Sequence, residues 1–233
     1  MTTWKRRVSP FLLLVVAICA SAHGVFAWVN RDRKPDLSII DPPLGSLERE
    51  AAAFGDHQFL YRAQVLELQN AGDTGGRSTP LGEYNYDYVV GWFQNLGALD
   101  PCAAHHDLLA TRLYAWGREP AVLRKLIDFI VSDVASCPQR KWYWQTQAIA
   151  MANHRLNDRP YGLELARKLA AYDLPDMPFW IFLYPAVLLA DMGQSQEALR
   201  EMEEVRQTRG AMMTTEDVNY VQQFEDRLRK NIP

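Results

Sequence analysis

Residues 186–205, AVLLADMGQSQEALREMEEV, contain two short amphipathic segments on either side of Met192-Gly193-Gln194. Small, large and glycine residues alternate along this stretch at intervals that suit two helices packed side by side. They are Ala186, Leu189, Gly193, Ala198, Met202 and Val205. Small side chains let two helices approach closely, and glycine allows a tight turn between them. The stretch therefore predicts two antiparallel helices joined by a short turn.

An earlier copy of the pattern is present, because Asn157 and Gly162 precede Gly193 and Ala198 by 36 residues each. The copy comprises Ala150, Asn157, Gly162, Ala166 and Leu169, and a fainter one comprises Tyr114, Gly117 and Val122. Over residues 105–210 the pattern resembles the tetratricopeptide repeat. That resemblance implies an α-solenoid with a concave protein-binding face, and it carries no catalytic residues. Asn153, where a large residue is expected, and Asn157, in place of glycine, depart from it. An ordinary α-helical bundle with small residues at its turns is the alternative.

The rest of the chain also predicts helices, separated by glycine- and proline-containing turns. We expect them over residues 47–70, 80–96, 108–116, 122–134, 142–156, 163–172, 182–192, 196–208 and 215–229. Thr214 or Thr215 is a suitable N-cap for the last of these, with Asp217 in its first turn. No stretch alternates convincingly like a strand. The predicted class is all-α, with antiparallel helix pairs after an N-terminal apolar helix.

The first thirty residues indicate a membrane segment. After Lys5-Arg6-Arg7, an uncharged run extends from Val8 to Asn30, long enough to cross the hydrocarbon core once. A cleaved signal peptide ending at Ala20-Ser21-Ala22 is the alternative. The run continues through Trp28, where an interfacial aromatic anchor belongs, so we favour an uncleaved anchor formed by residues Phe11 to Val29.

This interpretation divides the chain into a signal-anchor at residues 1–30, a linker at 31–45 and a helical domain at 46–233. The basic residues before the span favour a single pass through an inner (cytoplasmic) membrane, with the domain on the extracytoplasmic side. A face of small residues could also pack against another membrane helix, as in an accessory subunit. Its members are Ala17, Ala20, Gly24 and Ala27.

The charge of the chain argues against nucleic acid as the main partner. The formal net charge is -3, and no face-long basic block is present to replace the counterions of a duplex. We recognise no catalytic constellation, so the expected partners are other membrane or envelope proteins, and the expected function is a scaffold or accessory subunit. An envelope hydrolase with an unrecognised active site is the alternative.

Cys102 and Cys137 could form one disulfide if the domain is extracytoplasmic, because disulfides persist in oxidising compartments. The alternative is two unpaired thiols. Cys102 with His105 and His106 also has the residue types of a zinc site, but a structural zinc site usually shows two such close pairs. We therefore expect no metal and no cofactor. We expect the segment from His105 to Asp107 to begin a helix.

Two other features invite a functional interpretation. Asp73-Thr74-Gly75 resembles the aspartic protease triplet, but its flanks are helical in character, so we expect a surface loop. Aromatic residues make up 11% of the chain, and tyrosine and tryptophan are preferred anchors at protein interfaces. The candidate partner-binding residues are Tyr84, Tyr88, Trp92, Trp142, Trp144 and Trp180. Arg62, Arg77, Arg140 and Lys141 are expected to be solvated, and binding of an acidic partner tail is the alternative.

Overall fold

The computed structural model describes residues 9–31, 39–74, 77–116 and 119–230. It divides into two units, Met1–Leu37 and Ser38–Pro233. Helix α1, Pro10–Asn30, forms the first unit. Among the described residues it is the one helix that is long and apolar enough to cross a membrane, a property that signal sequences share. Several residues to which the sequence assigned a role lie outside the described ones: Lys5, Arg6, Arg7, Gly75, Gly76 and Gly117.

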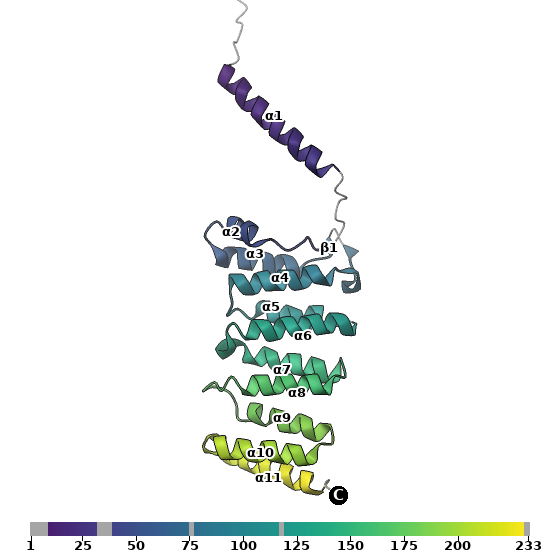
Figure 1. The fold of residues 1–233 in the computed structure, drawn as a ribbon, viewed down its shortest axis with the longest axis vertical. Helices are drawn as coiled ribbons and strands as arrows, with labels where there is room; N and C mark the ends of the chain where they lie inside the picture. The colour runs from purple at the N-terminus through teal and green to yellow at the C-terminus, as the bar shows by residue number, and fades with distance from the viewer. Residues whose placement is uncertain (1–8, 32–38, 75–76, 117–118, 231–233) are drawn as a thin grey trace, which may run out of the picture. The chain divides into compact units, whose positions relative to one another are not determined.

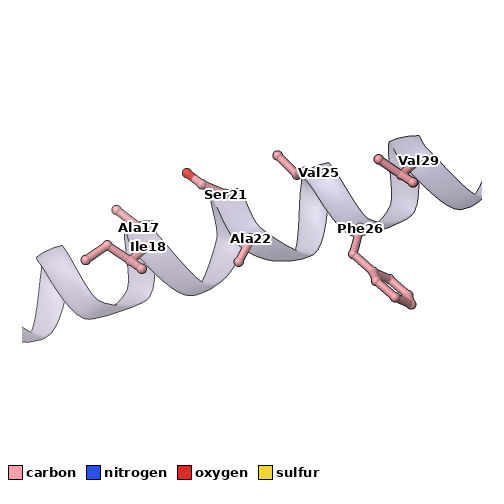
Figure 2. A pocket seen from close by; sticks show the side chains of 7 residues that line it. All are labelled: Ala17, Ile18, Ser21, Ala22, Val25, Phe26 and Val29. Atoms are coloured by element: carbon pink, nitrogen blue, oxygen red, sulfur yellow. The ribbon is translucent and has the colours of Figure 1, made fainter. Parts of the chain in front are cut away.

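The second unit, which we call the helical unit, is a stack of helices that runs from α2 at one end to α11 at the other (Figure 1). The predicted helical class is confirmed. The helices are α2 Ser46–Ala53, α3 His57–Gln69, α4 Tyr86–Leu99, α5 His105–Leu108, α6 Pro120–Val134, α7 Pro138–His154, α8 Arg159–Ala170, α9 Trp180–Asp191, α10 Ser195–Arg209 and α11 Thr215–Lys230. A π-helical segment, Leu109–Tyr114, continues α5, and short 3-10 turns span Leu81–Glu83 and Gly210–Met212.

The predicted turns owe their geometry to the residues that the repeat pattern singled out. Gly193, between α9 and α10, has a φ of 78°, and Asn157, between α7 and α8, has a φ of 58°. Asparagine tolerates this left-handed conformation better than most residues, so it replaces glycine here. The small and large positions of the pattern, Ala186, Leu189 and Ala198, are buried in the core.

The prediction of a single helix over residues 47–70 is wrong, because the structure has two helices there, α2 and α3. The chain reverses at Phe54 and Gly55, which both have positive φ, of 46° and 83°. Asp56 then caps α3 by accepting a hydrogen bond from the backbone N–H of Phe59 at 2.9 Å. Helical periodicity continues across the break, which is why the sequence did not reveal it.

Other boundaries also differ from the predicted ones. Helix α4 continues through Gly97 to Leu99, and α7 begins with Pro138 in its first turn, where proline is well tolerated. Thr214 is the N-cap of α11, since its hydroxyl oxygen accepts from the backbone N–H of Asp217 at 3.2 Å. The loop around Asp73 forms a two-residue antiparallel ladder, β1 Asp73–Thr74 with β2 Arg77–Ser78.

The predicted linker is too long at its C-terminal end. Ile40 is buried, and the backbone carbonyls of Asp41 and Leu44 accept hydrogen bonds from the side chains of Trp92 and Asn95, each at 2.8 Å. Residues 39–45 therefore pack onto α4 and belong to the helical unit.

Candidate functional site

The aromatic residues around α4 belong to the core. Tyr84 and Trp92 are buried, and the half-buried Tyr88 packs against the same cluster. The Tyr84 hydroxyl donates to the backbone carbonyl of Ala71 at 2.5 Å, and the Trp92 indole N–H donates to that of Asp41. Burial with satisfied polar groups corrects the expectation that Tyr84 and Trp92 anchor a partner.

The aromatic residues of α7 and α9 come together at the surface. The rings of Trp142 and Trp180 have centroids 6.5 Å apart, those of Tyr143 and Trp144 are 5.4 Å apart, and those of Trp180 and Tyr184 are 6.0 Å apart. Tyr143 and Trp180 are each 46% exposed. We call these five residues the α7–α9 aromatic cluster. It unites three of the candidates, Trp142, Trp144 and Trp180, and brings in two residues that the sequence did not single out.

The positions of these residues along their helices explain the exposure. Three consecutive aromatic residues on α7 point about 100° apart, so one core cannot cover them all. Trp180 and Tyr184 are four residues apart, which places them on one face of α9. That spacing is the sequence signal by which Tyr184 could have been found.

A second feature is a cluster of ionisable groups inside the helical unit. Lys141 on α7 is 0% exposed, and its Nζ lies 2.9 Å from Asp107 Oδ2 and 3.1 Å from His106 Nε2, and also contacts Asp133 on α6. His106 Nε2 lies 2.9 Å from Asp133 Oδ2, and His106 Nδ1 lies 3.1 Å from the Tyr61 hydroxyl. The expectation that Lys141 is solvated is therefore wrong.

The fold brings this buried ionic cluster together from three segments. His106 and Asp107 occupy the first turn of α5, Asp133 the last turn of α6, and Lys141 the first turn of α7. Gly97 of α4 leaves the space that Asp133 needs, because a Cβ there would lie 2.3 Å from Asp133 Oδ1. The cluster therefore depends on close approach of α4 and α6.

A disulfide lies beside the buried ionic cluster. Cys102 and Cys137 are joined, with their Cα atoms 5.3 Å apart and a sequence separation of 35. Cys102 comes just before α5, and Cys137 is the N-cap of α7. Because its sulfur is oxidised, Cys102 does not offer a thiolate to a metal.

The cluster contains residue types that bind metals, since ligand atoms of His106, Asp107 and Asp133 lie within 4.8 Å of one another. The ammonium group of Lys141 lies among them and supplies the positive charge. Asp133 also borders a surface recess between α4 and α6, whereas His106, Asp107 and Lys141 are fully buried. The arrangement resembles a buried ion-pair network more than a substrate site.

Burial and neighbouring charges shift the pKa values of the cluster. Burial raises the pKa of Asp107 to about 8, against the attraction of Lys141. For Asp133, burial opposes ionisation, but His106 and Lys141 hold its pKa below the ordinary value. Burial lowers the pKa of His106 and raises that of Tyr61 to about 12. The fold therefore favours the ionised form of Asp133 and the protonated form of Asp107.

Because the fold raises the pKa of Asp107, we expect the free energy of unfolding to fall as the pH rises toward 8. The unfolded chain releases the Asp107 proton near its ordinary pKa of 3.8, and the folded chain near 8. Between those values the folded state binds the extra proton, so the free energy of unfolding falls with rising pH until the folded group has titrated. The lowered pKa of His106 gives a slope of the opposite sign around pH 6.5. Thermal unfolding between pH 7 and 9 therefore measures the Asp107 slope, and Asp107→Asn is expected to flatten it. An equal slope in the variant would contradict the assignment.

Comparisons with known proteins identify no relative of the chain. No protein-family model, no curated protein and no solved structure matches the chain. The Asp73-Thr74-Gly75 motif gains no support from the fold either, because the β1–β2 ladder follows α3 and precedes a 3-10 turn.

Proposed function

We propose that the chain is a single-pass membrane protein whose helical unit binds other membrane or envelope proteins as a scaffold or accessory subunit. The observation that carries the proposal is the exposure of Tyr143 and Trp180 within the α7–α9 aromatic cluster. Large rings that pack against one another and keep open faces offer contact area at low conformational cost, which is typical of interface anchors. The helical stack and its repeat pattern are consistent with a tetratricopeptide-like arrangement.

The proposed location is the inner membrane of a bacterial-type envelope, with the helical unit on the extracytoplasmic side. Helix α1 has the length and composition of a span, and basic residues precede it in the sequence. The disulfide supports an oxidising compartment for the helical unit.

A hydrolase has less support from the geometry. Such an enzyme needs an acid–base group that can reach its substrate, with a partner that orients it. His106 and Asp133 are paired in this way, but His106 is buried and Asp133 is committed to Lys141.

Truncating an exposed ring of the cluster is expected to lower partner affinity on the order of tenfold or more, as at interface hot spots. We would purify the full-length protein from gently solubilised membranes, identify co-purifying proteins by mass spectrometry, and compare Trp180→Ala and Tyr143→Ala with the unmodified chain. Tyr220→Ala on α11 is a matched control, because Tyr220 is 45% exposed.

A stoichiometric partner that is lost with both cluster variants and kept with Tyr220→Ala supports the proposal. Equal recovery with all three variants contradicts binding through the cluster. A further variant replaces α1 by an unrelated apolar helix. If it no longer recovers the partner, while Trp180→Ala and Tyr143→Ala still do, α1 makes the contact instead. A protein that purifies as a monomer without any partner would overturn the scaffold and subunit functions alike.

A further inference from the structure

The end of the helical unit nearest to α1 in sequence exposes apolar side chains. Leu47 on α2 is 85% exposed, Phe54 at the α2–α3 turn is 96% exposed, and Phe59 on α3 is 67% exposed. Ala63 and Leu66 of α3 are exposed as well. We call these five residues the α2–α3 apolar face. Stacks of helical repeats usually end in a polar outer face, which keeps them soluble.

The face follows from the helical positions of its residues. Phe59, Ala63 and Leu66 lie at intervals of four and three, so they form one stripe along α3. The opposite side of the same helix, with Leu60, Val65 and Leu68, packs into the core. Helix α3 is thus apolar on two sides, of which the core covers one.

Phe54 is the most exposed member and also a strained one. A bulky residue with a φ of 46° is uncommon and costs free energy relative to glycine. This conformation presents an aromatic ring at the tip of a tight turn, where the core gains nothing from it. An apolar partner outside the helical unit would account for its presence.

We propose that the α2–α3 apolar face rests on the lipid headgroup region of the membrane that α1 spans. This inference depends on the proposed membrane anchor. Ile39 follows Asn30, the last residue of α1, by nine positions, a stretch of about 30 Å at most when fully extended. If α1 crosses the bilayer, the first helices after it are therefore held within reach of the lipid surface.

Charges in the sequence between α1 and Ile39 are compatible with a lipid surface. Arg31, Arg33 and Lys34, which attract anionic lipids, outnumber the two carboxylates of the same stretch, Asp32 and Asp36. Glu50 and His57, paired at 2.9 Å on either side of the Phe54 turn, favour headgroup depth over the acyl core. The face thus has the mixed character of a surface-seated amphipathic element.

The test places an environment-sensitive fluorophore, NBD, on single cysteines of the full-length protein in lipid nanodiscs. The background is Cys19→Ser, which leaves the disulfide intact. Phe54→Cys and Phe59→Cys report on the face, Ile18→Cys reports on α1, and Val218→Cys on α11 is the control at the other end of the stack. The nanodiscs contain phosphatidylcholine and phosphatidylglycerol, with or without nitroxide-labelled lipid.

We expect nitroxide lipid to quench labels at positions 54 and 59 about threefold more than the label at 218, as for a face within the interface. Quenching at 18 with none at 54 and 59 would leave the anchor standing and overturn this inference. Absence of quenching at 18 would overturn the anchor and the inference together. Blue-shifted emission at 54 without lipid quenching would show that protein covers the face, such as a second copy, and would also overturn it.

Discussion

Replacing Lys141 by methionine is expected to destabilise the helical unit by about 3–5 kcal/mol, the usual cost of removing one partner from a buried ion pair. Methionine has nearly the same shape, so packing changes little. What is lost is the only positive charge within contact of Asp107 and Asp133 among the described residues. The buried Asp133 carboxylate would then keep its contact with His106 but lose the charge of Lys141.

Chemical unfolding of the full-length protein in mild detergent, followed by tryptophan fluorescence, measures this effect. Lys168→Met is the matched control, because Lys168 forms an exposed pair with Glu164 on α8. Such surface pairs contribute about 0.3–0.5 kcal/mol. Equal losses in the two variants would mean that Lys141 does not occupy the interior.

Removing the disulfide is expected to have an effect of similar size. The bond closes a loop with a sequence separation of 35 residues, and the chain-entropy model then assigns it about 3–4 kcal/mol. The expected result for Cys102→Ser with Cys137→Ser is a lower unfolding midpoint with the native helical content. The midpoint of the unmodified protein should fall by the same amount when a reductant is added.

Cys19→Ser provides the control, since Cys19 is a free cysteine on α1. It should leave the midpoint and the response to reductant unchanged. A double serine variant that unfolds at the same denaturant concentration as the oxidised protein would contradict the stabilising role of the bond.

The disulfide and the buried ionic cluster should also be coupled. His106 follows Cys102 by four residues, and Lys141 follows Cys137 by four. The bond therefore holds the two chain segments that supply most of the cluster. Variants that share partners in this way usually lose less in combination than the sum of their separate losses.

Much of the fold was predictable because the signals are local. Proline and glycine mark most of the turns, and apolar periodicity places helices such as α6 and α10 within a few residues of their ends. The break at Phe54 was not predictable, because phenylalanine is uncommon with positive φ. The sequence also left the pairing of Cys102 with Cys137 open. A disulfide persists in an oxidising compartment, and the sequence does not fix the compartment of the domain.

The candidate site was only partly predictable, because burial depends on contacts far apart in sequence. Trp92 and Trp180 look alike in sequence, yet Trp92 finds an acceptor at Asp41, 51 residues away, and is buried. From the local sequence Lys141 is expected to be a solvated cation, because Asp107, one of its two carboxylate partners, lies 34 residues earlier. Local sequence patterns cannot show such long-range contacts. They therefore do not distinguish a surface aromatic residue that could bind a partner from one that is buried in the core.

The turn position and the small-residue position of the repeat pattern constrain sequence variation in different ways. At Gly193 the constraint is backbone chirality, and asparagine meets the same demand at position 157. At Gly162 the constraint is space, because a Cβ would lie 1.9 Å from Asn153 Oδ1. Positions 153 and 162 thus share one volume. A larger residue at position 162 is therefore expected to require a smaller or reoriented side chain at position 153, whereas position 193 can exchange glycine for asparagine on its own.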